Sequence, residues 1–259
     1  MTLKRLCLQC KKQGRHPIKK AALRFFLTLF LFGPCSLALA KGDDAASPTN
    51  YEMVEAPTAY TLLHGGYDFT ARMYENGGLF FRANIGFKDV FMAGFSANAT
   101  HVVGSGDIQV QTPRLALKAK VLDQKSSPVA LALGWDDRGY GTEIAGRFFP
   151  GLQKGFYAVT SHEFPELGFI QVHGGMSAVK FDNFDASQDL GLFGGTSFSF
   201  FTGLVFNLEL DKVLTNYWQF NANFIFNFDN PLRIGLDLRD INRGDLFSRI
   251  VRVQYISFF

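Results

Sequence analysis

The sequence predicts an all-β fold, a single antiparallel transmembrane β-barrel of about 12 strands that follows a cleaved signal peptide. Apolar and polar residues alternate with period two over most of the chain beyond residue 60, as side chains do along a strand. Hydrophobic residues make up 47% of the sequence, with 29 Phe, which is rich in Phe for a soluble enzyme. The chain also ends on an alternating strand, IVRVQYISFF, without a polar tail.

The first 40 residues resemble a secretory signal peptide. They carry basic residues and no acidic one, followed by the apolar stretch FFLTLFLFGPCSLALA, and we expect cleavage after Ala40. An uncleaved membrane anchor is one alternative, although the stretch contains Gly33 and Pro34 and is short for a span of ~20 residues. A lipoprotein site at Cys35 is another, to which the preceding proline is a poor fit.

Removing this segment changes the charge of the chain. The whole sequence has 26 basic and 23 acidic residues, and the leader takes 8 of the basic ones, leaving 18 against 23. The basic character therefore belongs to the targeting segment, and no nucleic-acid partner is predicted. All three cysteines lie in the leader, and the histidines lack metal-ligand spacing, so neither a metal site nor a cofactor is expected.

The rest of the chain divides into two parts. Residues 41–58 are polar with two prolines, and they predict a flexible periplasmic arm. Residues 59–259 form the predicted barrel. Their expected strands are 65–74, 79–87, 90–97, 113–122, 128–136, 154–162, 167–174, 190–200, 203–211, 217–228, 231–239 and 249–259.

The clearest alternation is in YWQFNANFIFNF, where aromatic residues and Ala222 share one face and Gln219 and three asparagines share the other. A soluble sandwich also alternates, with its polar face in water. A membrane barrel is favoured because the apolar faces are rich in Phe and Leu, and because aromatic residues lie near strand ends, where interfacial belts occur. These are Tyr67, Trp135, Tyr217 and Trp218.

The lengths of the connections support an even number of strands. Counted along the chain, every even-numbered connection is short, and most odd-numbered ones are long; the first is the exception. Short periplasmic turns and long external loops are typical of outer-membrane barrels, with both chain ends in the periplasm. We therefore expect the protein in the outer membrane of a Gram-negative bacterium, in contact with its lipid.

The last strand resembles the carboxy-terminal insertion signal of Gram-negative outer-membrane proteins, with Tyr255 and Phe259 on the lipid face. This resemblance implies recognition by the barrel-insertion machinery. Ser257 departs from the pattern, which usually has a bulkier residue there.

About a third of the chain also resembles the YjbH-type exopolysaccharide-associated outer-membrane family. The resemblance rests on a Pro-Ala-Leu-Gly strand with an Asp and Gly turn, followed by a Tyr-x-x-x-Ser strand. The matching residues are Pro128, Ala130, Gly134, Asp137, Gly139, Tyr157 and Ser161. It implies a link to surface polysaccharide, and no catalytic residue is carried over from it.

Charges on the polar faces are the candidate site. Basic residues are expected on the early strands and the last one, and acidic residues mainly on the late strands. The pore-lining candidates are Arg72, Arg82, Arg114, Lys118, Lys120, Glu209, Asp211, Asp237, Arg239 and Arg252. A basic wall opposite an acidic wall would select solutes, or the same residues would pair across a plugged lumen.

The expected function is passage or binding of a small polar solute or a polysaccharide, with a link to surface polysaccharide export. The alternative is a non-conducting scaffold that binds partners through loops 98–112 and 137–152. A lipid-modifying enzyme is disfavoured, because Ser161 and His162 are adjacent on a strand and point to opposite faces. The sequence therefore predicts no enzyme and no catalytic residue.

Overall fold

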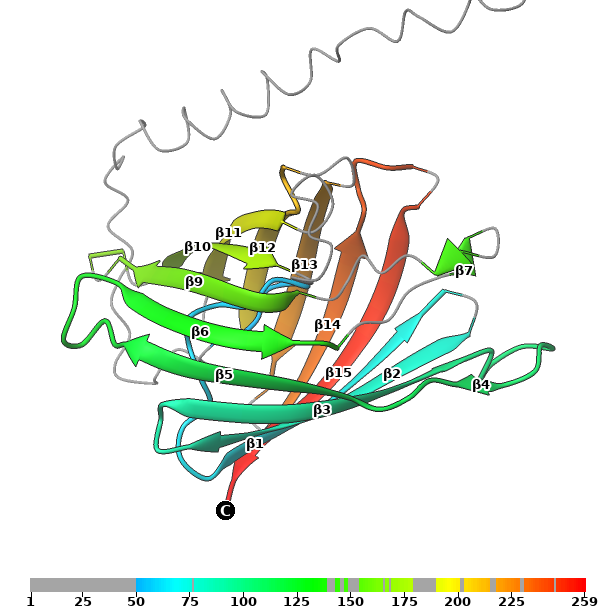
Figure 1. The fold of residues 1–259 in the computed structure, drawn as a ribbon, viewed down its shortest axis with the longest axis horizontal. Coiled ribbons are helices and arrows are strands. Elements are labelled where there is room, and N and C mark those ends of the chain that lie inside the picture. Colours follow the sequence, from blue (N-terminus) through cyan, green and yellow to red (C-terminus); the bar gives the residue numbers. More distant parts are fainter. Residues whose placement is uncertain are drawn as a thin grey trace, which may run out of the picture. The chain divides into compact units, whose positions relative to one another are not determined.

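The computed structural model describes residues 50–259 except 76, 139–142, 145–146, 149–153, 165, 168, 179–189, 201–202, 215–217, 229–230 and 245, with backbone alone at 143–144 and 147–148. Within these residues, twelve long strands form the barrel (Figure 1). They are β1 (Gly66–Tyr74), β2 (Gly78–Phe87), β3 (Phe91–Thr100), β5 (Arg114–Leu122), β6 (Ala130–Asp136), β9 (Gly155–Glu163), β10 (Ile170–Ala178), β11 (Leu190–Phe200), β12 (Leu204–Asp211), β13 (Gln219–Asn227), β14 (Leu232–Arg239) and β15 (Ser248–Phe258). Three two-residue strands, β4 (Gln109–Val110), β7 (Glu143–Ile144) and β8 (Arg147–Phe148), lie in the connections.

The sheet closes on itself, because the first strand pairs with the last. β1 and β15 are antiparallel in a register from Gly66 opposite Phe258 to Met73 opposite Val251. Each of the remaining barrel strands pairs antiparallel with the barrel strands that precede and follow it in the chain. The predicted closed barrel of about twelve strands is confirmed, and closure leaves no unpaired sheet edge.

The two faces of the wall have opposite polarity. Large apolar side chains are exposed on the outside, among them Phe69, Phe81, Phe95, Leu115 and Leu133. The inward positions are mostly polar and buried. Exposing such a belt to water would be costly, whereas lipid makes it favourable, so the wall has the surface of a transmembrane barrel.

The described turns follow the predicted asymmetry. We call the end with Gly66 and Phe258 the terminal end, and the opposite end the loop end. The turn at 88–90 and the one at 123–129 join strands at the terminal end, whereas longer connections cross the loop end. Among the described residues, no helix is long and apolar enough to cross a membrane.

Two sequence expectations need correction: the extent of loop 98–112 and the end of the strand expected at 167–174. Part of loop 98–112 is strand, because β3 continues to Thr100 and pairs with β4 through Ala99 and Val110. Most of loop 137–152 lies outside the described residues, as do the signal peptide and Tyr217. β10 also runs to Ala178 rather than stopping at the Gly174–Gly175 pair. A Cβ on Gly175 would lie 2.5 Å from the ring of Phe193, so this glycine makes room for an aromatic neighbour.

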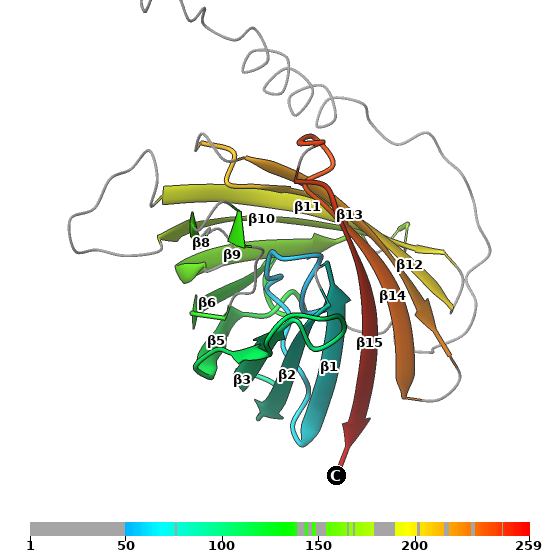
Figure 2. The ribbon, with the colours of Figure 1, turned by 90° about the vertical axis from the view of Figure 1, so that its right-hand side faces the viewer.

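The described part of the predicted flexible arm is not an arm. Residues 50–60, here called the lumen hairpin, lie inside the barrel (blue in Figure 2). Glu52 bridges to Pro57, and the Met53 amide donates to the Ala56 carbonyl at 3.0 Å. Met53, Val54 and Ala56 are fully buried, which a solvated arm would not allow. The expectation failed because the apolar residues and the acids of this segment find partners on the wall; residues 41–49 lie outside the described residues.

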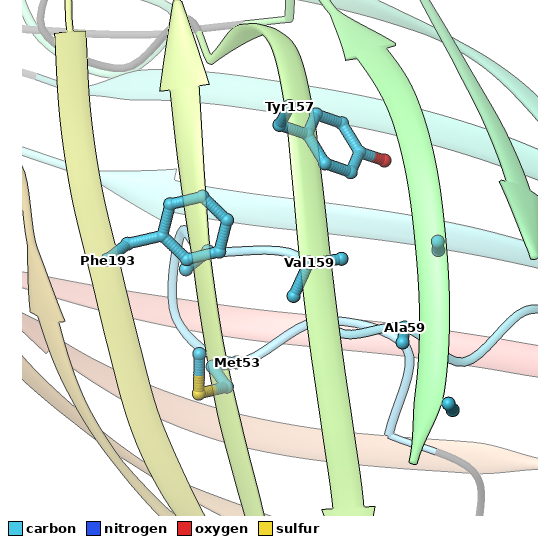
Figure 3. Packing of buried hydrophobic residues seen from close by; sticks show 8 residues of the cluster. Met53, Ala59, Tyr157, Val159 and Phe193 are labelled. Carbon is cyan, nitrogen blue, oxygen red and sulfur yellow. The ribbon is translucent and has the colours of Figure 1, made fainter. Parts of the chain in front are cut away.

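A dry patch inside the lumen receives one side of the hairpin. Met53, Ala56 and Ala59 pack against Tyr157, Val159 and Phe193 and against two alanines of β6 (Figure 3). A Cβ on Gly195 would overlap the Leu208 carbonyl oxygen and lie 2.6 Å from the Met53 sulfur, so a larger residue would not fit where Met53 approaches the wall. This apolar patch packs one side of the hairpin against β6, β9 and β11.

Candidate functional site

Three arginines converge on the lumen hairpin from neighbouring strands. Arg72 of β1 lies directly opposite Arg252 of β15, and Arg82 is on β2, next to β1. All three side chains are buried. Like charges placed directly opposite each other in a sheet repel, so this arrangement requires nearby carboxylates.

Glu52 of the hairpin supplies the central carboxylate. One of its oxygens pairs with Arg72 and lies 3.9 Å from Arg252 Nη2, and the other pairs with Arg82. Burial by itself would raise the pKa of Glu52, but Arg82, Arg72 and Arg252 hold that pKa well below its usual range. Glu52 is therefore ionised and shared among the three arginines.

Two further carboxylates complete this cluster. Asp237 of β14 accepts a hydrogen bond from Arg252 Nη2 at 2.8 Å and lies 3.8 Å from Arg72 Nε. Glu55 of the hairpin accepts from Arg72 Nη1 at 3.1 Å. The wall contributes one carboxylate to the cluster and the hairpin contributes two, so the hairpin neutralises much of the basic charge.

On the other side of the hairpin, Glu209 of β12 binds its backbone. One carboxylate oxygen accepts hydrogen bonds from the amides of Val54, Glu55 and Ala56 at 3.0, 2.9 and 2.8 Å. The second oxygen accepts from Asn221 at 2.8 Å. Consecutive amides that converge on one anion form a favourable electrostatic site, and here they belong to the tip of the hairpin.

Lys118 of β5 also binds backbone. Its ammonium donates to the carbonyls of Tyr51, Thr58 and Tyr60 at 2.8, 3.1 and 3.0 Å. These carbonyls come from both arms of the hairpin. Because an ammonium has three donors, all of them are used in holding the two arms together.

Uncharged wall groups hold the arms at several points. Asn50 donates to Asn207 at 2.9 Å and to Ser197 at 3.2 Å. The Tyr51 hydroxyl hydrogen-bonds Asp68 of β1 and accepts from Gln254 at 2.5 Å. The hairpin is thus bonded to wall groups on either side of the lumen.

His173 lies between two serine hydroxyls of the lumen wall, those of Ser161 and Ser197. His173, opposite Ser161 on the adjacent strand, places Nδ1 2.8 Å from the Ser161 hydroxyl. Adjacent His162 is directed to the Pro128 carbonyl instead, as expected from strand geometry. The other His173 nitrogen lies 3.1 Å from the Ser197 hydroxyl rather than a carboxylate. Ser161 also accepts a hydrogen bond from the Ala59 amide at 2.8 Å, so it anchors the hairpin and is not poised as a nucleophile.

The ten predicted lumen charges separate into two groups. Six lie around the hairpin or in direct contact with it: Arg72, Arg82, Lys118, Glu209, Asp237 and Arg252. Four pair elsewhere along the wall. Asp211 binds Lys154, Arg239 lies 3.4 Å from Asp240, Arg114 lies 3.4 Å from Asp137, and Lys120 pairs with Asp123.

Sequence reasoning missed Glu52, Glu55 and Lys154. A signal for the first two existed in NYEMVEAP, where the acids flank an apolar Met-Val pair in an otherwise polar segment. Nothing local marks Lys154, which lies between a long loop and a strand.

The predicted insertion residues lie together at the terminal end. Phe259 stacks on Tyr67 with ring centroids 6.0 Å apart, and Tyr255 lies 6.3 Å from the same ring. The Phe259 amide donates to the Gly65 carbonyl at 3.2 Å. The final residues therefore continue the seam between the last and first strands on the lipid face; recognition by the insertion machinery stays a prediction.

A groove of about 660 Å³ lies outside the lumen, over β3, β5, β6, β9 and β10. Its outward lining includes Leu117, Leu133, Phe156 and Met176, which are exposed apolar residues of the lipid-facing belt. We do not assign it to the candidate site, because the charged groups face the opposite side of the wall.

No model of a known protein family matches the chain, and no curated protein matches it in sequence. Among solved structures it is similar to the KdgM porin, with 13% identity, a TM-score of 0.49, and coverage of 75% of this chain and 99% of that one. It is also similar to the NanC porin, with 11% identity, a TM-score of 0.42, and coverage of 74% and 99%. The Acinetobacter baumannii outer-membrane protein Omp33 gives 9% identity, a TM-score of 0.41, and coverage of 76% and 99%. At these identities and TM-scores, the similarities carry no argument about the function of this chain.

Proposed function

We propose that the protein is an outer-membrane barrel that passes small polar solutes and is closed at rest by its own lumen hairpin. The observation that carries the proposal is the hairpin itself, with Glu52 on the arginines and Glu209 on the backbone at its tip. A twelve-stranded wall lined with polar groups provides a hydrated path once the hairpin leaves the lumen.

The path of the chain makes withdrawal of the hairpin feasible. The returning arm leaves at the terminal end, where Thr61 and His64 bond to Asp89 in the turn between β2 and β3. The other arm runs beside it, since the Thr58 hydroxyl donates to the Asn50 carbonyl at 2.7 Å. Both arms lie on the same side of the tip, so the hairpin can withdraw without threading the chain through the barrel.

The exchange of partners on opening also favours a reversible gate. Breaking a buried ion pair is costly when the separated charges remain dry. Here withdrawal of Glu52 leaves Arg72, Arg82 and Arg252 in a lumen that water can enter. Hydration offsets part of the lost ion pairing, so closed and open states can lie closer in free energy than the contacts suggest.

A reversible cross-link between the hairpin and the wall tests this function. Residues 41–259 contain no cysteine, and the Ala59 amide lies 2.8 Å from the Ser161 hydroxyl. We expect the Ala59→Cys/Ser161→Cys protein to be silent in planar bilayers when oxidised and to show channel events after reduction. Each single cysteine variant is the control. Equal conductance in the oxidised and reduced states would contradict the gate.

A non-conducting scaffold is the second candidate, because the connection between β3 and β5 exposes apolar side chains. Val103, Ile108 and Val110 are 74%, 63% and 75% exposed at the loop end. Such residues suit binding of a partner. Silence of the reduced double-cysteine protein, together with a partner captured by the full chain and lost on removal of residues 101–108, would favour the scaffold.

A link to surface polysaccharide export belongs to the same proposal. It rests on the resemblance of the segment around Pro128 and Tyr157 to the YjbH-type family. Deletion of the protein in its host should then reduce surface polysaccharide; unchanged polysaccharide would remove this part of the proposal and leave the channel untouched.

A further inference from the structure

The contacts of Glu52 describe a receptor for a carboxylate. One oxygen pairs with Arg72 and the other with Arg82, while Arg252 lies beside the first oxygen. Guanidinium groups suit planar, two-oxygen anions because their donors are arranged in a rigid fork. The wall provides the donors, and the chain's own glutamate provides the anion.

Charge balance shows what the wall lacks without the hairpin. Arg252 keeps Asp237 at 2.8 Å, and Arg72 keeps the same carboxylate at 3.8 Å. Glu52 is the carboxylate that pairs with Arg82 in the described part of the chain, and the wall leaves Arg82 with the Thr70 hydroxyl at 3.4 Å. Withdrawal of the hairpin therefore exposes a buried cationic site in which Arg82 has lost its ion-pair partner, while Asp68 of β1 shares the Thr70 hydroxyl with it.

We propose that Arg72, Arg82 and Arg252 bind a carboxylate-bearing solute, and that Glu52 occupies this site in the closed barrel. The solute and the hairpin compete for the same arginines, so binding of the solute favours the open state. This competition rests on the proposed gate, whereas the existence of the carboxylate site does not. A neutral solute lacks the charge that replaces Glu52, and a cation would be repelled.

Chemical rescue tests the site independently of conduction. Glu52→Ala in the full-length chain removes the carboxylate and leaves a space between the arginines. We expect sodium acetate to raise the unfolding temperature of this variant in detergent by several degrees relative to sodium chloride at equal ionic strength. Wild-type protein and Glu55→Ala should show at most a small difference, because Glu52 fills the site in both.

A second substitution identifies the receptor. In Glu52→Ala/Arg82→Gln the acetate effect should disappear, whereas in Glu52→Ala/Arg114→Gln it should remain, because Arg114 pairs at the barrel end with Asp137. Phosphate at the same ionic strength distinguishes the two anion chemistries, and rescue by phosphate alone would contradict a carboxylate site. An acetate effect equal to that of chloride in Glu52→Ala would overturn the proposal.

Competition is tested on the wild-type channel with a matched pair of probes. Glucuronate and glucose have similar size and differ in one carboxylate. We expect glucuronate to raise the open probability at least fivefold more than glucose, and Arg82→Gln to remove the difference. If acetate stabilises Glu52→Ala but the wild type shows no channel activity, the gate is refuted and the carboxylate site stands. If the wild-type channel does not respond to glucuronate and acetate does not stabilise Glu52→Ala, the site is refuted and the gate stands.

Discussion

The two walls that hold the lumen hairpin recognise different parts of it. The arginines of β1, β2 and β15 bind the side chains of Glu52 and Glu55, whereas Glu209 and Lys118 bind backbone amides and carbonyls. The arginine wall therefore depends on the hairpin sequence, and the backbone contacts depend on its shape. Together they fix both the register and the depth of the hairpin in the lumen.

The largest effect should come from breaking the arginine wall at its centre. Arg72→Ala leaves Glu52, Glu55 and Asp237 with less compensation in a buried cluster, which costs about 3–5 kcal/mol. Arg114→Ala, at the half-exposed pair with Asp137, should cost about 0–1 kcal/mol. Urea unfolding in detergent measures both. Equal costs would contradict the difference between the hairpin cluster and the pairs at the barrel ends.

The backbone contacts come next. Glu209→Ala leaves the amides of Val54, Glu55 and Ala56 without their acceptor, and we expect a loss of about 2–3 kcal/mol with frequent channel opening. Glu209→Gln keeps an acceptor oxygen and should lose less. If Glu209→Ala channels stayed closed as firmly as the wild type, recognition of the backbone would not hold the gate.

A smaller effect separates the two hairpin acids. Glu52 lies among three arginines with both oxygens in ion pairs, whereas Glu55 accepts a hydrogen bond from Arg72. We expect Glu52→Gln to cost about 2 kcal/mol and Glu55→Gln about 0.5–1 kcal/mol. The matched pair differs in contacts and not in chemistry. A larger effect of Glu55→Gln on unfolding or open probability would reverse the assignment of the central carboxylate.

The smallest effect near neutrality is on pH dependence. The arginines hold the pKa of Glu52 below the usual glutamate value of about 4.3, against the effect of burial. A group with a lowered folded-state pKa stabilises fully above the unfolded value and loses this contribution as pH falls toward the folded value. The contribution of Glu52 to closure should thus be constant from pH 8 to 5 and fall below pH 4, so the difference in open probability between the wild type and Glu52→Gln should shrink below pH 4. A difference that shrinks between pH 8 and 5 would point to another group.

The sequence predicted the wall far better than its contents. Alternation is a local property, so Phe224 and Asn223 could be assigned to opposite faces from their positions alone. The same alternation assigned Arg72 and Glu209 to the lumen face. The hairpin was missed because its partners are distant in the chain, as with the Ala56 amide and Glu209, and because a short polar segment has no period to read. Residues 41–58 resembled a solvated arm because they are mostly polar and contain two prolines, although the lumen itself is polar.

The most direct test of the central claim is the reaction of a single cysteine in the hairpin with a water-soluble maleimide. Met53 is fully buried against the wall, whereas Leu63, just beyond the hairpin, is 51% exposed. In the folded barrel, Met53→Cys should react at least a hundredfold more slowly than Leu63→Cys, and both should react alike after heating in dodecyl sulfate. Equal rates in the folded barrel would show that residues 50–60 do not occupy the lumen.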